Sequence, residues 1–312
     1  MACGECPKEI IMRIYQSSMT IRHLREFAKR HPNLMPNILL SYALLANDLP
    51  HFLHRDRSLY RSIILDSGVF SLQKPGARQT PEELYPKFKT FAQYNPGAWD
   101  LIFNFDLHFG LDSYDKNLEY QIDLEQAGIP VVPVIHNIYN DDADKIIARG
   151  LPVHKTVAIG QCAGRTTLKN VKPVVMKLHN AGARIHFFGS SEYRLMAKLP
   201  IWSCDSSSWA KYPSLGVVLY WNPKRSGFDK TDKIYFPKHQ EGTPPRGTIY
   251  YRDYDYLHDF EDYLEVYHGM IITDLMGEED DLFRGVVNML YYYMLEEIIT
   301  QQQRALGFDL PG

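Results

Sequence analysis

Short apolar runs alternate along this chain with stretches whose apolar residues recur at helical spacing. The runs predict strands over Asn37–Leu45, Ser62–Leu65, Leu101–Phe105, Val131–Ile135, Thr156–Ile159, Arg184–Phe188 and Ile201–Ser203, with a further strand at Val217–Trp221. The helical spacing predicts helices over Pro81–Tyr94, Tyr114–Ala127, Asp141–Arg149, Asn170–Asn180 and Ser191–Lys198. Apolar strands separated by helices are typical of a parallel sheet, and seven or eight such units favour closure into a (β/α)8 TIM barrel, an α/β fold.

The length and the change of pattern near Trp209 predict how the chain is organised. Its 312 residues fit one barrel of about 250 residues with additions. We expect one barrel domain over 1–312, in which 211–253 form an aromatic and basic insertion at the rim and 256–303 form C-terminal helices. The alternative, an open doubly wound sheet, usually carries a G-x-G-x-x-G turn, which this sequence lacks.

Charge and cysteine content limit the partners that this protein can bind and the compartments in which it can work. The net charge of -3 excludes nucleic-acid binding through the whole surface, so any such partner must meet a local basic patch. The N-terminus lacks an apolar signal segment and no long apolar run follows, so we expect no membrane contact and a reducing cytoplasm. Cys3 and Cys6 form half a zinc motif without a second pair, which favours two free thiols.

Residues at the predicted strand ends are the candidates for chemistry, because active sites of such barrels lie there. Six strands end in Asp66, Asp106, His136, Gly160, Gly189 and Asp205. A single aspartate at such a place is often the N-cap of the next helix, but three at corresponding ends favour a shared site. Two carboxylates facing one sugar suit glycosyl transfer, since one can attack the anomeric carbon while the other moves a proton.

The segment Leu65–Phe70, L-D-S-G-V-F, resembles the D-S-G-G-[FY] signature of the tRNA-guanine transglycosylase superfamily. Further segments resemble, in order, that family's base-recognition aspartate, its two glycine-ended strands and its nucleophile: Asn104–Asp106, Val157–Gly160, Phe187–Gly189 and Cys204–Asp205. The similarity covers Ser62 to Trp209. The run D-S-S-S-W at 205–209 is most similar to the compact, often phage-encoded DNA 7-deazaguanine transglycosylases.

The resemblance implies a pentosyltransferase that exchanges guanine in DNA for a free 7-deazaguanine base. Asp205 would be the nucleophile on C1′ of a nucleotide, and Asp66 would be the general acid and base. Asp106 would read the guanine edge. The remaining pocket residues would be His136, Gly160, Gly189 and Phe70, the last of which either stacks on the base or packs in the core.

Departures from the family pattern keep alternatives open. Val69 replaces the second glycine of the signature, and His136 stands where the family has a glutamine. The family's C-terminal zinc motif, C-x-C-x-x-C with a later histidine, is absent, so no cofactor is expected. That absence weighs against exchange on tRNA, which remains an alternative. A metal-dependent hydrolase is another, with the ligands Asp66, His108, His136 and Asp205; the lack of H-x-H after the first strand weakens it.

Nucleic acid would meet the basic and aromatic segment after the nucleophile. Lys and Arg neutralise phosphates, and aromatic faces stack on unpaired bases. The residues expected to contact DNA, or tRNA, are Lys211, Lys224, Arg225 and Lys230. A solvated loop with its own aromatic cluster is the alternative. The acidic, tyrosine-rich C-terminal helices offer a surface for a homodimer, and a phage-encoded protein would work in the cytoplasm of its bacterial host.

Overall fold

A ring of parallel strands forms the centre of the molecule. The computed structural model describes residues 12–45, 49–72, 79–95, 97–110, 112–160, 164–237, 243–277 and 279–308, so Cys3 and Cys6 lie outside the described residues. The strands are hydrogen-bonded in the order β5-β4-β3-β2-β1-β9-β8-β7-β6. Their bounds are β1 Arg13–Ser17, β2 Asn37–Ser41, β3 Ser62–Asp66, β4 Leu101–Phe103, β5 Val131–Val132, β6 Val134–Ile135, β7 Thr156–Ile159, β8 Arg184–Phe187 and β9 Ser203–Ser206.

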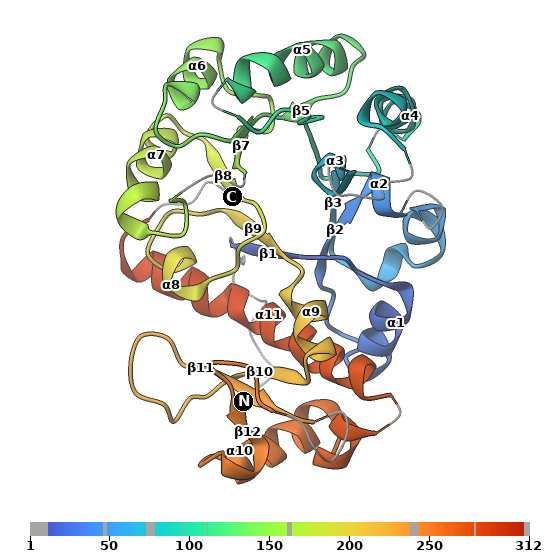
Figure 1. Cartoon of the computed structure of the whole chain (residues 1–312), viewed down its shortest axis with the longest axis vertical. Coiled ribbons are helices and arrows are strands. Elements are labelled where there is room, and N and C mark those ends of the chain that lie inside the picture. The colour runs from blue at the N-terminus through green and yellow to red at the C-terminus, as the bar shows by residue number, and fades with distance from the viewer. Residues whose placement is uncertain are drawn as a thin grey trace.

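The ring closes because β5 and β6 are two halves of one strand that Pro133 interrupts. A proline has no N–H for the ladder, although its carbonyl still accepts a hydrogen bond from the Ala158 N–H at 2.9 Å. β5 pairs with β4 and β6 pairs with β7, both in parallel. The fold is therefore a (β/α)8 TIM barrel, as predicted, and not an open sheet (Figure 1).

Helices follow the strands around the outside of the barrel (Figure 1). They are α1 Ile21–Arg30, α2 Tyr42–Leu45, α3 Val69–Leu72, α4 Pro81–Tyr94, α5 Ser113–Gln126, α6 Asp142–Arg149, α7 Leu168–Asn180, α8 Tyr193–Met196, α9 Ser208–Ser214 and the C-terminal α11 Asp280–Ala305. The start of α4 illustrates the local causes: the Thr80 hydroxyl accepts from the Glu83 N–H while the Glu83 carboxylate accepts from the Thr80 N–H.

Apolar side chains fill both faces of the ring. One cluster packs inside the barrel and includes Tyr15, Leu39, Ile64, Phe103, Val132, Ala158 and Trp202. A larger cluster packs between the strands and the helices. Because successive side chains of a strand point to opposite faces, the strands β1 to β7 each contribute to both clusters. The interior is thus solid, and any cavity must lie at an end of the barrel.

The first strand of the barrel, β1, was not predicted. Val217–Trp221 was predicted as the further strand, but that segment belongs to a separate sheet and β1 completes the barrel. β1 contains only two adjacent apolar residues, and its Gln16 is buried because the amide nitrogen donates to the Met289 carbonyl of α11 at 3.0 Å. The strand predicted to run from Asn37 ends at Ser41, where α2 begins.

The C-terminal helix α11 is bonded to the N-terminal ends of the first three barrel strands through one buried carboxylate. Glu296 Oε1 accepts hydrogen bonds from the Ile14 N–H at 2.8 Å and from Asn37 Nδ2 at 2.6 Å. Its Oε2 pairs with Arg61 Nη2 at 2.6 Å. These partners come from the starts of β1 and β2 and from the residue before β3, so α11 ties three strands together.

A second sheet lies on the far side of α11 from the barrel (Figure 1). It consists of β10 Val217–Trp221, β11 Thr231–Tyr235 and β12 Ile249–Tyr250, followed by α10 Leu257–Tyr263. Asn288 of α11 accepts from the Leu219 N–H at 2.7 Å and donates to the Val217 carbonyl at 3.2 Å. The segment predicted as an insertion over 211–253 is therefore mainly this sheet, and Lys211 itself belongs to α9.

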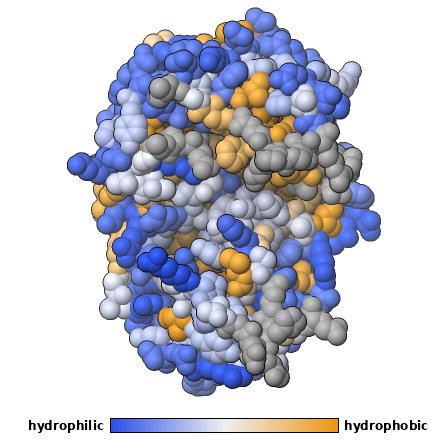
Figure 2. Space-filling view, viewed as in Figure 1, coloured by the Kyte–Doolittle hydropathy of each residue, from blue (hydrophilic) through white to orange (hydrophobic). Residues whose placement is uncertain are grey.

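Hydrophilic residues dominate the periphery of the face seen in Figure 2, and hydrophobic residues show mainly in recesses between the elements. Among the helices that the structure describes, none combines the length and the apolar character needed to cross a bilayer.

Candidate active site

A cavity of about 190 Å³ lies at the C-terminal ends of the barrel strands. The residues predicted for catalysis and base binding all line it: Asp66, Phe70, Asp106, His136, Gly160, Gly189 and Asp205. None of the three aspartates is the N-cap of the following helix, because α3 starts after Gly68, α5 after Asp112 and α9 after Ser207. The cavity is smaller than the 300–1,000 Å³ typical of pockets for drug-sized ligands, so it suits a single small ring system.

Asp66, the last residue of β3, sits where its ionisation is unfavourable. Loss of water around the carboxyl, and then the negative charges of Asp205 and Asp106, raise its pKa from 3.8 to about 7. Its Oδ2 accepts from Ser41 Oγ at 3.2 Å and from the Gly68 N–H at 3.1 Å, and both bonds oppose that rise. The Gly68 contact requires a left-handed backbone, with φ at +76°, which glycine adopts readily. Near neutral pH this carboxyl can both give and take a proton.

Asp205, in β9, is held by the strand beside it. Its Oδ1 accepts a hydrogen bond of 2.6 Å from the Gly189 N–H. The Nε2 of His186, in β8, lies 3.6 Å from the same oxygen. The other ring nitrogen, Nδ1, lies 2.8 Å from Ser203 Oγ. This histidine is fully buried inside the barrel beside Asp205, and burial lowers the pKa of His186.

Asp106 and His136 form a pair across from Asp205. His136 Nε2 lies 3.2 Å from Asp106 Oδ2, and Asn104 Nδ2 donates to Asp106 Oδ1 at 3.1 Å. Burial raises the pKa of Asp106, while the His136 and Asn104 contacts oppose the rise. The carboxylate of Asp106 can therefore receive an N–H group of a heterocycle, whereas the Nδ1 of His136 is enclosed beside Gly160.

Two glycines line the cavity. A Cβ on Gly160 would lie 2.6 Å from His136 Nδ1 and 3.1 Å from Val134 Cγ1, so any side chain there would displace the histidine. Gly189 has φ at +60°, which directs its N–H to Asp205. Both positions follow strands, as the sequence indicated, and both bring bare backbone to the cavity.

Aromatic rings border the cavity on two sides. Phe70 is half-exposed and packs edge-on against Phe109, at 5.5 Å between ring centroids. Phe109 packs in turn against His136 at 4.9 Å. On another side the ring of Phe188 packs against Phe103 and His186, with 4.4 Å and 4.7 Å between ring centroids. Phe70 is therefore a rim residue and not a core aromatic, and it is exposed enough to contact a bound ring.

Two residues of the site were not found from sequence. Arg165 lines the cavity from the loop after β7, and His186 stands inside β8 under Asp205. A polar residue within an apolar strand, as in Ile185-His186-Phe187, is the only signal that the sequence offered for the histidine. Trp209 and Cys204 are fully buried, and the Trp209 indole N–H donates to the Ser17 carbonyl at 2.7 Å.

The basic residues expected to meet nucleic acid lie on α9 and the second sheet. Lys211 is exposed on α9. Lys224 pairs with Asp259 at 2.5 Å, and Arg225 pairs with the buried Asp232. Lys230 donates to the Pro223 carbonyl at 3.2 Å. The charges of Lys224 and Arg225 are thus partly balanced within the second sheet and the helix that follows it.

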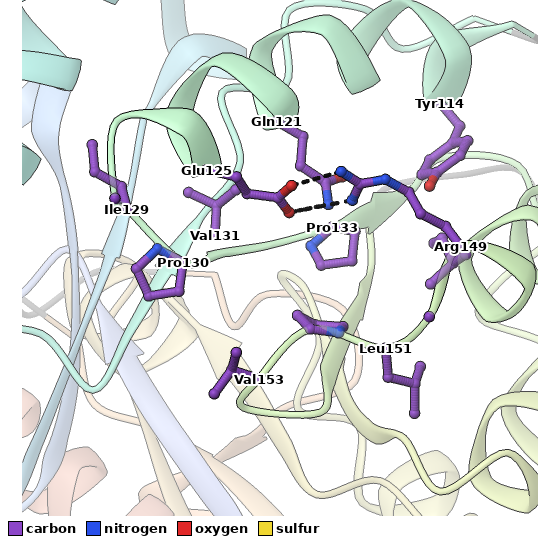
Figure 3. Close-up of a pocket in the computed structure, with 14 residues that line it drawn as sticks. Tyr114, Gln121, Glu125, Ile129, Pro130, Val131, Pro133, Arg149, Leu151 and Val153 are labelled. Atoms are coloured by element: carbon purple, nitrogen blue, oxygen red, sulfur yellow. Dashed lines mark hydrogen bonds and ion pairs between the residues drawn. The ribbon is translucent and has the colours of Figure 1, made fainter.

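A larger cavity of about 550 Å³ lies at the opposite end of the barrel, before β5 and β7 (Figure 3). Prolines and aliphatic residues line much of it, and its charged pair, Glu125 and Arg149, is joined at 2.6 Å. The amide nitrogen of Gln121 donates to Glu125 at 2.8 Å. The Glu125 carboxylate and the Arg149 guanidinium therefore pair with each other across this cavity. This end of a barrel usually contributes to stability and not to catalysis.

Of the four ligands expected for a metal-dependent hydrolase, Asp66, His136 and Asp205 line the cavity and His108 does not. Within the described ranges no three His, Cys, Asp or Glu side chains group so as to hold a metal ion. The backbone N–H and carbonyl of His108 are bonded to the side chain of Asn117.

Comparisons with known proteins add little to this geometry. No protein-family model and no curated protein matches the chain. A structure from Coccidioides immitis, solved as a candidate fructose-1,6-biphosphate aldolase, aligns with a TM-score of 0.44 and 10% identity. The alignment covers 66% of this chain and 78% of that one. The barrel assignment therefore stands on the strand order described above.

Proposed function

We propose that this protein is a pentosyltransferase that exchanges guanine in DNA for a free 7-deazaguanine base through a covalent intermediate on Asp205. The observation that carries the proposal is the pairing of two carboxyls with opposite environments in one small cavity. Asp205 accepts a backbone N–H, which suits an ionised nucleophile. Asp66 has its pKa raised to about 7, which suits a group that alternates between acid and base.

The other residues of the cavity support a purine-like ligand. Asp106 can bind an N–H group of a ring edge, and Gly160 and Gly189 bring bare backbone to the cavity. A base must leave its stack to reach such a cavity, which costs a few kcal/mol that contacts to rings such as Phe70 help to offset.

In the proposed reaction a carboxylate oxygen of Asp205 bonds to C1′ of the target nucleotide. The C1′–N9 bond breaks, its electron pair leaves on guanine, and Asp66 gives that base its proton. The incoming 7-deazaguanine then passes its N9 proton to Asp66. Its N9 bonds to C1′, the bond between C1′ and Asp205 breaks, and both carboxyls return to their starting states.

The test is incubation of the full chain with a labelled 7-deazaguanine and either guanine-containing DNA or tRNA. We expect label in DNA, none with Asp205→Asn, and a sugar adduct on Asp205 detectable by mass spectrometry when the free base is withheld. Asp255→Asn, which changes an exposed aspartate, is the matched control and should incorporate normally. Label in tRNA alone would favour the tRNA enzyme, and label in neither polymer would reject both.

A further inference from the structure

Arg165 is a buried cation in a cavity otherwise marked by three carboxyls. Only 8% of the residue is exposed. Its Nη1 donates to the Phe188 carbonyl and lies 3.4 Å from the Gly160 carbonyl, and its guanidinium lies 5.4 Å from the centre of the Phe187 ring. Its Nη2 is 3.7 Å from where a Cβ of Gly189 would stand. The guanidinium is therefore held between the ends of β7 and β8, on the side of the cavity next to Asp205.

The barrel places this cation relative to a base bound as proposed above. In the ring of eight strands, β4 and β9 are opposite each other, so Asp106 and Asp205 face across the cavity. A base that reaches from one to the other has its N1 and 2-amino edge at Asp106 and its N9 at Asp205. One flank of that base carries N3, and the other carries O6 and position 7.

The donors of the cavity decide which flank faces which strand. O6 is an acceptor, and it suits the side of the cavity that carries Arg165, whose guanidinium only donates. The O6 and position-7 flank then faces His136, Gly160 and Arg165, and N3 faces Asp66 at the end of β3. Because O6 lies nearer the Asp106 end and position 7 nearer the Asp205 end, the guanidinium beside Gly189 falls next to position 7.

We infer that Arg165 forms a subsite for the 7-substituent and that the base carries an electron-rich acceptor there, for which a carboxylate is the best match. A guanidinium binds a carboxylate through paired N–H donors, whereas an ammonium group at the same place would be repelled. The inference rests on the proposed function for the orientation of the base, but it names a substrate class that the proposed function leaves open.

The test is calorimetric titration of the full chain, without any polymer, with free 7-carboxy-, 7-cyano- and 7-aminomethyl-7-deazaguanine and with guanine. We expect the carboxy base to bind more tightly than the aminomethyl base by about tenfold or more. Arg165→Gln should weaken the carboxy base by about tenfold to a hundredfold and leave the aminomethyl base unchanged or improved. Arg165→Lys keeps the charge and should keep the order of preference.

The matched control is Arg194→Gln, which removes an arginine that is exposed on α8 and does not line the cavity. It should leave all four affinities unchanged, and thermal melting checks that each variant is folded. Equal or tighter binding of the aminomethyl base, or an equal loss for every base in Arg165→Gln, overturns the subsite while the proposed function stands. A loss confined to binding of a DNA oligonucleotide overturns it too, since Arg165 would then serve a phosphate. Failure of every base to bind rejects the proposed function and the subsite together.

Discussion

The replacement Asp66→Asn should stabilise this protein at neutral and alkaline pH. The pKa of Asp66 is raised from 3.8 to about 7 in the folded state, mainly by burial and then by the charge of Asp205. Between those two values the folded chain holds a proton that the unfolded chain has lost, so stability falls as pH rises through this window. An asparagine does not ionise and is free of that cost.

The size of the effect follows from the shift. Each pKa unit corresponds to about 1.4 kcal/mol. A shift of roughly three units therefore lowers the free energy of unfolding by at most about 4 kcal/mol at pH values above the folded pKa. Part of that cost is already present at about pH 5, since the unfolded carboxyl is ionised there. The stability of Asp66→Asn relative to the native protein should therefore rise by about 2–3 kcal/mol between about pH 5 and about pH 8.

The measurement is urea unfolding of both proteins at several pH values across that window, compared as the difference in free energy of unfolding. Using the difference removes the contributions of all other titrating groups that the substitution leaves alone. Asp255→Asn, at an exposed position, should give a difference that does not change with pH. A flat difference for Asp66→Asn, or one that falls with rising pH, would refute the reasoning and with it the assignment of Asp66 as a proton carrier.

Three further predictions rest on other parts of the molecule. Gly160→Ala should weaken binding of a free base by more than about tenfold in calorimetry, because its Cβ would stand 2.6 Å from His136 Nδ1 and displace that ring; undiminished binding would contradict the cavity geometry. Glu296→Ala should cost about 3–5 kcal/mol in urea unfolding, because it leaves the buried end of Arg61 and two N–H donors unpaired; a loss below about 1 kcal/mol would show that α11 does not hold the barrel ends. Last, removing the charges of Lys224, Arg225 and Lys230 together should weaken the binding of DNA and make the affinity for DNA less dependent on salt concentration. An unchanged dependence of affinity on salt would exclude phosphate contacts at these three residues.

Much of the barrel was predictable because its signals are local. Apolar runs of four or five residues, Thr80 with Pro81 at the start of α4, and glycines after helices each act within a few neighbours. The first strand escaped because its burial depends on α11, nearly the whole chain away, which accepts the hydrogen bond from Gln16 and receives the Ile14 N–H on Glu296. No local pattern records a partner so distant in sequence.

The candidate site divides in the same way. By itself the sequence determined that aspartates, a histidine and glycines stand at strand ends, and the rule that parallel strands of a barrel end at one mouth was enough to bring them together. The tertiary structure alone decided that Asp66 is a weak acid while Asp205 accepts the Gly189 N–H, that His186 lies 3.6 Å from Asp205 inside the barrel, and that Arg165 enters the cavity. The physical reason is that pKa values and ligand contacts depend on burial and on charges a few ångströms away, and those neighbours come from different strands.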